Sequence, residues 1–207
     1  MALGTYAQLQ ASIAAWATRS DLTATIPDFV TWAHEEICRR LRCGTMLVSA
    51  SATVATETMA APTDFAAVSS FYLILTPRRK LQINTAAGIQ DLISSTSTAT
   101  YPTDVAVEGV NFRFGPLFSG SAAAQILYFA RPTTLVNATD TNVILTKYPY
   151  LYLYGALEAL FRYLEDDNNA DRYGAQFGGL IESINMQEAK DALSGPLAAG
   201  RPSGFAV

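Results

Sequence analysis

Residues 149–164 read PYLYLYGALEALFRYL, and the structure of this stretch decides how the chain folds. Its first tyrosines alternate with other residues, as the side chains on one face of a strand do. Over the whole stretch, however, apolar side chains recur at helical spacing: Tyr150, Leu151, Tyr154, Leu157, Leu160, Phe161 and Leu164. We therefore predict a helix with aromatic side chains on several faces, some of which contact neighbouring helices or other subunits.

A second helix is expected directly after this one. Glu165, Asp166 and Asp167 close the first helix, and either Asn168 or Asn169 is expected to cap the next. Its apolar residues are Tyr173, Phe177, Leu180, Ile181 and Ile184. Three glycines inside it, each costing about 1 kcal/mol relative to alanine, are expected to permit close approach of another helix: Gly174, Gly178 and Gly179. Residues 146–193 thus form a C-terminal helical pair.

Residues 1–45 predict an N-terminal helical pair. The first helix begins with a capping box in which Thr5 and Gln8 bond each other's backbone, and its stripe is Tyr6, Leu9, Ile13 and Trp16. The second begins near Thr25 with Pro27 in its first turn and ends by Gly44. Its buried face is Ile26, Phe29, Val30, Ala33, Ile37 and Leu41, and its expected surface pairs are Glu35 with Arg39 and Glu36 with Arg40.

The pattern between the helical pairs is that of strands. Period-two alternation over 46–54 predicts a strand, residues 68–75 are rich in strand formers, and residues 77–80 resemble a hairpin tip. A short helix is expected over 85–94, followed by strands at 104–108, 111–114 and 123–129. The fold class is therefore α+β. The two helical pairs pack as one domain around an antiparallel β-rich insertion at 46–145, and residues 194–207, with three Gly and two Pro, form an extended C-terminal arm.

Composition limits the classes of function. Charged residues make up 15% of the 207 residues, whereas about 25% is typical of soluble domains, so part of the surface is expected to contact other subunits. The net charge of −4 argues against a nucleic-acid binder, whose affinity comes mainly from neutralising phosphates. We find no signal peptide and no apolar run long enough for a membrane span, so we expect synthesis in the cytoplasm and no membrane partner.

Two short basic runs stand out in this acidic chain. The first holds Arg39, Arg40 and Arg42, and the second holds Arg78, Arg79 and Lys80. Such runs more often mark a solvated edge or a salt-bridged face than a phosphate site.

Residues for catalysis or metal binding are few. His34 is the sole histidine, and with Cys38 and Cys43 it falls short of a closed zinc site. The glycines of the last helix do not follow a strand and lack a P-loop ending, and the acidic residues 165–167 lack the spacing of a calcium loop. We therefore expect no catalytic site, metal or cofactor, and a plain helical or interfacial role for His34.

Several segments together resemble one family. They are TYAQLQ at 5–10, IAAW at 13–16, RSDL at 19–22, IPDF at 26–29, RRLR at 39–42, YFARP at 128–132 and YLYLYGAL at 150–157. In this order, over roughly residues 4–190, the chain resembles the head-to-tail adaptor (head–tail connector) proteins of the tailed-bacteriophage neck, of the short-tailed-phage type.

The resemblance implies a virion structural protein and not an enzyme. Such adaptors form a ring, typically of twelve copies, beneath the portal, join it to a tail or nozzle protein, and let DNA pass. The helices form the body of the ring, the β-rich part faces the tail, and a C-terminal arm reaches the portal or a neighbouring subunit. The expected arm contacts are Leu193, Leu197, Arg201 and Phe205; the expected subunit- or helix-packing residues are Trp16, Phe29, Tyr150, Tyr154, Tyr173 and Phe177.

Two alternatives remain open from the sequence. A tail-tube terminator or completion ring would need more continuous β structure than the predicted helices leave. A small hydrolase acting on cell wall or nucleic acid would need a catalytic carboxylate, such as Asp64, Asp91 or Glu108.

Overall fold

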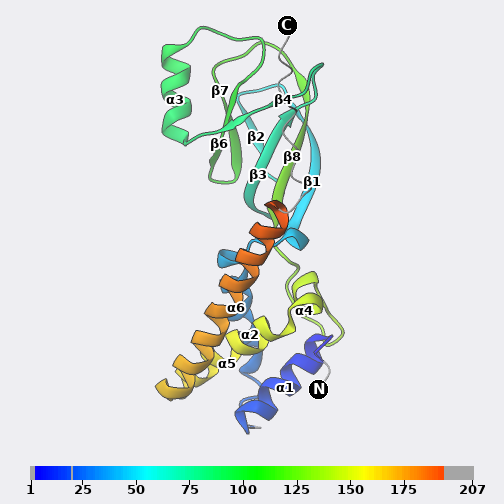
Figure 1. Ribbon diagram of the computed structural model, residues 1–207, viewed down its shortest axis with the longest axis vertical. Coiled ribbons are helices and arrows are strands. Elements are labelled where there is room, and N and C mark those ends of the chain that lie inside the picture. The colour runs from blue at the N-terminus through cyan, green and yellow to red at the C-terminus, as the bar shows by residue number, and fades with distance from the viewer. Residues whose placement is uncertain (1–2, 20, 194–207) are drawn as a thin grey trace, which may run out of the picture. The chain divides into compact units, whose positions relative to one another are not determined.

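The computed structural model describes residues 3–19 and 21–193 of the chain (Figure 1). The chain divides into two compact units. A helical unit combines the two ends of the chain, Met1–Gly44 and Thr134–Val207, and a β unit is formed by Thr45–Thr133. The predicted α+β fold class is confirmed.

The helical unit contains α1 (Tyr6–Ala17), α2 (Ile26–Arg40), α4 (Val143–Lys147), α5 (Pro149–Tyr163) and α6 (Asp167–Leu193). Stretch 149–164 is therefore a helix and not a strand, as its longer period predicts. Helix α5 packs against both α2 and α6. The core of the unit is made of residues at the predicted apolar positions, among them Leu9, Ile13, Ile26, Ala33, Ile37, Leu151, Leu157, Leu160 and Phe177, each at most 1% exposed.

Two of the predicted helix starts, those of α1 and α6, differ from expectation in their capping bonds. The Thr5 hydroxyl accepts from the Gln8 N–H, as predicted, but the Gln8 side chain accepts from Gly4 N–H and so reaches one residue further back. Helix α6 begins after Asp166, whose carboxylate accepts from the N–H of Asn169, so neither predicted asparagine is its cap. A carboxylate is well suited to this position because the helix dipole favours negative charge there.

The insertion ends earlier than the expected residue 145. Residues 134–145 belong to the helical unit, because their backbone bonds the first turn of α1: the N–H of Tyr6 donates to Asp140 O at 2.9 Å. The end of this stretch forms the short helix α4, which the sequence patterns did not predict, and the Asn142 side chain caps it by accepting from the N–H groups of Ile144 and Leu145. Those two apolar side chains are fully buried.

The β unit contains two four-stranded sheets. One has the order β1 (Leu47–Val54), β8 (Ala122–Ala130), β3 (Phe65–Leu73), β4 (Arg79–Lys80); the other has the order β2 (Thr58–Ala60), β7 (Asn111–Gly115), β6 (Asp104–Glu108), β5 (Gln82–Ile83). A buried core is formed from residues of both sheets, including Val54, Phe71, Leu73, Val105, Phe112, Phe114 and Ile126.

Strand pairing in the β unit is antiparallel with one exception. Strand β5 leaves the predicted hairpin tip and pairs with β6 in parallel, so the expectation of an antiparallel insertion fails at this pair. The chain then forms α3 (Ala86–Ser95), which lies beside β6 and β7 (Figure 1) and buries Ile89 completely. The predicted short helix is thus confirmed.

The expected surface pairs on α2 form differently. Arg39 pairs with Glu36 one turn back, at 2.6 Å, and not with Glu35. In place of the predicted pair between Glu36 and Arg40, both oxygens of the Glu36 carboxylate accept from Arg39. Both spacings bring side chains together on a helix, so sequence alone does not choose between them.

Close helix approach occurs at a glycine that the sequence did not single out. A Cβ atom at Gly155 would lie 2.9 Å from Ala33 Cβ on α2 and 3.2 Å from the Phe177 ring on α6. Gly179, by contrast, has no atom within 4 Å of such a Cβ. The three-helix contact thus occurs at Gly155. Of the predicted glycines, Gly174 does lie close to α5, because a Cβ there would be 3.0 Å from the carboxyl carbon of Glu158.

We predict opposite effects for alanine at these two glycines. Gly155→Ala should destabilise the protein by about 1–3 kcal/mol through overpacking, despite the better helix propensity of alanine. Gly179→Ala should stabilise it by up to about 1 kcal/mol, because only propensity changes there. Urea unfolding of the two variants measures this; equal stabilities would show that α5 does not depend on the glycine contact.

Candidate functional site

Four of the six predicted packing residues form one aromatic cluster in the helical unit. Trp16 of α1 lies 6.0 Å from the Tyr154 ring of α5 and 6.4 Å from the Tyr173 ring of α6. Tyr154 lies 5.8 Å from Tyr150 and 6.1 Å from Tyr173. Phe161, stacked on Tyr173 at 5.5 Å, completes what we call the aromatic cluster: Trp16, Tyr150, Tyr154, Phe161 and Tyr173.

The aromatic cluster is only partly covered by its own chain. Trp16 is 40% exposed and Tyr150 is 51% exposed, while the other three rings are half-buried. Trp and Tyr are enriched in protein interfaces because they combine a large apolar surface with a polar atom that tolerates water. An apolar pocket lined by Tyr148, Tyr150, Leu151, Leu180 and Ile184 extends this surface between α5 and α6.

The other two predicted packing residues, Phe29 and Phe177, lie elsewhere in the helical unit. Phe29 is 9% exposed and its ring is 5.6 Å from Tyr163, whereas Phe177 is 1% exposed and lies 6.5 Å from Trp32. Their partners Tyr163 and Trp32 are themselves 61% and 39% exposed, and sequence reasoning missed both. Helical spacing was the available signal, since Trp32 lies three residues after Phe29 on α2.

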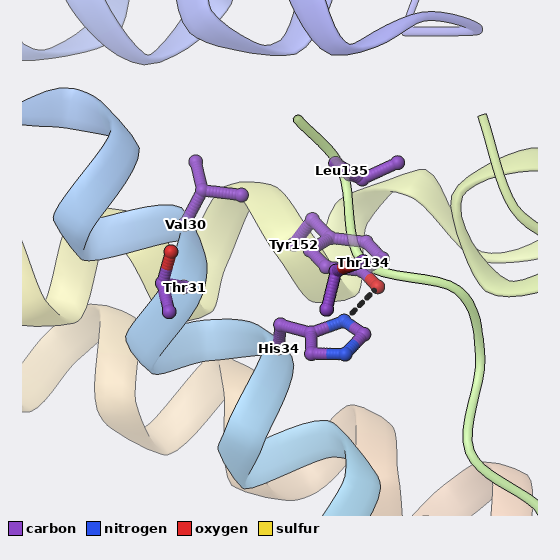
Figure 2. Close-up of a pocket in the computed structure, with 6 residues that line it drawn as sticks. All are labelled: Val30, Thr31, His34, Thr134, Leu135 and Tyr152. Carbon is purple, nitrogen blue, oxygen red and sulfur yellow. Dashed lines mark hydrogen bonds between the residues drawn. The ribbon is translucent and has the colours of Figure 1, made fainter. Parts of the chain in front are cut away.

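A buried polar network lies on the opposite side of α5. The Tyr152 hydroxyl accepts from Asn142 Nδ2 at 2.8 Å and lies 2.9 Å from His34 Nδ1. Figure 2 shows His34 and Tyr152 pointing toward one another beside a cavity of about 20 Å³. Because the hydroxyl already accepts from Asn142, its proton is available to His34 Nδ1, which then acts as the acceptor. Burial raises the pKa of Tyr152 and keeps it a neutral donor.

His34 therefore has the helical role that the sequence predicts for it. Its Nε2 lies 3.5 Å from Cys38 Sγ, one turn further along α2. Among residues 3–19 and 21–193, no three histidine, cysteine or acidic side chains lie close enough to hold a metal ion. The arrangement ties α2, α4 and α5 together through hydrogen bonds.

The three carboxylates considered for a hydrolase lie in different parts of the β unit. Asp64 accepts from the Tyr128 hydroxyl at 2.9 Å, Glu108 forms an ion pair with Arg113 at 3.1 Å, and Asp91 is exposed on α3. Desolvation and the neighbouring Asp64 raise the pKa of Tyr128, so that this tyrosine stays a donor. Asp64 and Glu108 thus have structural roles in the β unit, as the hydrogen-bond acceptor of Tyr128 and the ion-pair partner of Arg113.

The expected arm contacts fall mostly outside the described residues. Leu193 is the last residue of α6, and Leu197, Arg201 and Phe205 lie beyond it. In the described part of the chain, every helix is too short or too polar to cross a membrane.

Comparison with known proteins supplies the identity that the geometry alone does not. A family model described as SU10 adaptor protein matches residues 4–200, which includes residues of both units. No curated protein matches the chain. The match covers every segment on which the resemblance to phage adaptors rests, and the family name is consistent with the short-tailed type. The chain therefore belongs to the SU10 adaptor protein family, whose members are structural head-to-tail adaptors of bacteriophages.

Proposed function

We propose that the chain is one subunit of a ring, of the twelve copies typical of the adaptors it resembles, that docks beneath the portal in the virion neck. The ring joins the capsid to a tail or nozzle protein and leaves a channel for DNA. The observation that carries the proposal is the half-exposed aromatic cluster on α1, α5 and α6. Membership in an adaptor family supports the same assembly.

The aromatic cluster is suited to contact between copies of the chain. Covering Trp16 and Tyr150 would remove large apolar surfaces from water, at about 25 cal/mol per Å². Each subunit of a closed ring has two neighbours, so a modest contact is repeated around the ring and strengthened by closure. The low share of charged residues favours this use of the surface, because less charge has to be desolvated.

We assign the helical unit to the ring body, the β unit to the tail-facing side, and residues 194–207 to a C-terminal arm. Leu197 and Phe205 would serve as apolar anchors and Arg201 as a polar one. A segment that orders on binding loses conformational entropy, so docking becomes strong only when several arms bind together.

The last turns of α6, from which the arm departs, are held firmly to the rest of the helical unit. Asn185 accepts from the N–H of Arg42 at 2.9 Å and donates to Arg40 O at 3.0 Å, and so satisfies the end of α2. Glu188 accepts from the Gly44 N–H at 2.9 Å and pairs with Lys147 at 3.3 Å. These bonds would give the arm a fixed starting point in every subunit.

The overall charge supports a passive channel. A net charge of −4 per chain, repeated around a ring, is consistent with a channel that binds DNA only weakly and lets it slide. The energy for DNA movement then comes from outside the ring, which acts as a docking collar.

The first prediction concerns the ring itself. Negative-stain images of the protein mixed with its portal should show added ring density. Tyr150→Ser should raise the protein concentration needed for this assembly at least tenfold. Tyr163→Ser is the matched control, because Tyr163 is a similarly exposed tyrosine outside the aromatic cluster. Equal assembly by both variants would remove the cluster from the interface.

The second prediction concerns the C-terminal arm. Deleting residues 195–207 should leave the melting temperature of the isolated protein unchanged, since these residues follow the end of α6, and should abolish attachment to the portal. Co-sedimentation with portal measures attachment. Unaltered attachment by the shortened chain would rule out the arm as the portal contact.

The third prediction follows from the pKa of Glu188, which is lowered by the Gly44 N–H, with Lys147 adding to the effect. A carboxyl whose folded pKa is lowered stabilises the protein above its ordinary pKa of 4.5, and this contribution disappears as the pH falls through the folded value. Glu188→Gln should therefore lower the melting temperature at pH 7 by roughly 2 °C and have little effect at pH 3.

Glu182→Gln is the control for this pH effect, because Glu182 is an exposed glutamate on the same helix. It should change the melting temperature little at either pH. If the deficit of Glu188→Gln were the same at pH 3 and pH 7, the Glu188 contacts would not depend on its charge.

A further inference from the structure

The two basic runs of the sequence differ in the contacts that their side chains make in the structure. The first is used within its own helix: Arg39 pairs with Glu36, and the Arg42 guanidinium donates to the carbonyls of Cys38 and Leu41 at 2.9 and 2.6 Å. Two of the three side chains in that run are therefore bonded locally, as the sequence favours, while the side chain of Arg40 is exposed.

The second run, Arg78, Arg79 and Lys80, is arranged differently. All three side chains are exposed. Arg79 and Lys80 form β4, the outer strand of its sheet, which is labelled in Figure 1. Within residues 3–19 and 21–193, no carboxylate lies within 4.0 Å of their charged nitrogens. The β unit thus presents three positive charges that its own acidic residues do not neutralise, although the chain as a whole is acidic.

These three cationic side chains line a concave surface, and hydrogen bonds and strand pairing hold some of their atoms in place. The hollow has a volume of about 610 Å³ and is lined by all three, together with Leu75, Thr76, Pro77 and Tyr101. Arg78 donates to the Gln125 side chain at 3.2 Å, and Gln125 donates to the Ser49 hydroxyl at 2.9 Å. Pairing of Leu73 with Arg79 and of Tyr72 with Lys80 holds the backbone of the tip. We call this surface the basic tip.

We propose that the basic tip binds the phosphate backbone of DNA without reading its sequence. This inference rests on the proposed channel and adds the contact that the passing DNA makes. Guanidinium groups match the paired oxygens of a phosphate, and a lysine adds a third positive charge. The hollow is wider than one carboxylate requires, and Tyr101 offers a ring and a hydroxyl to an adjoining sugar.

The number of charges suits a sliding contact. Two or three phosphate contacts per copy are weak and exchange quickly, whereas a ring would present many at once. Repulsion by the acidic remainder of the chain confines DNA to the basic tip. An acidic segment of a partner protein would use the same charges, and the experiment separates these two ligands.

The test is an NMR titration of the full chain with a short DNA duplex. Amide shifts should move at residues 76–80 and 101, and the logarithm of the affinity should fall with the logarithm of salt concentration at a slope of about −2.7, the value for three phosphates. Arg78→Gln with Arg79→Gln should weaken binding at least tenfold. Arg39→Gln with Arg40→Gln, which removes the same charge from the first run, should weaken it less than twofold.

Three outcomes would overturn the proposal. The proposal fails if DNA changes the amide shifts of residues outside the basic tip instead of those within it. It also fails if the two double variants lose DNA affinity equally. Tighter binding of polyglutamate than of DNA at the same salt concentration would identify an acidic protein as the ligand instead. Assembly with portal is scored separately: if the unmodified chain joins the portal but does not bind DNA at the basic tip, only the inference about DNA fails.

Discussion

The helical unit depends on one constraint, which is that α5 is apolar around most of its circumference and has to be covered on several sides. Helix α2 covers one side, where Ala33 meets Gly155, and α6 covers another through Phe177. What remains is the side that carries Tyr150 and Tyr154, which meets α1 but is not fully buried. The side of α5 that its own chain leaves partly exposed is therefore the surface suited to contact with other subunits.

The buried polar network fixes how these helices pack. A hydroxyl buried among apolar groups is costly unless its hydrogen bonds are made, so Tyr152 is accommodated only where His34 and Asn142 both reach it. Asn142 also caps α4 and so orders the chain between β8 and α5. Apolar packing alone tolerates sliding of one helix along another, whereas this network admits a single arrangement.

The two units expose different chemistry. The helical unit presents half-exposed aromatic rings, a type of surface that is enriched in protein interfaces. The β unit presents the basic tip, whose charges act through water and depend on salt. The proposed subunit contact and the proposed DNA contact therefore lie in different units of the chain.

The sequence by itself determined every described α-helix except α4, most of the strands and the α+β class, because apolar spacing and capping residues act over a few positions. It also marked Trp16 and Tyr150 as packing residues. Only the tertiary structure decided that these two rings both pack against Tyr154, that α2 and α6 come closest to α5 at Gly155, and that Arg39 of the first basic run has a carboxylate partner. Such outcomes depend on which residues far apart in the chain become neighbours, and local patterns carry no information about that.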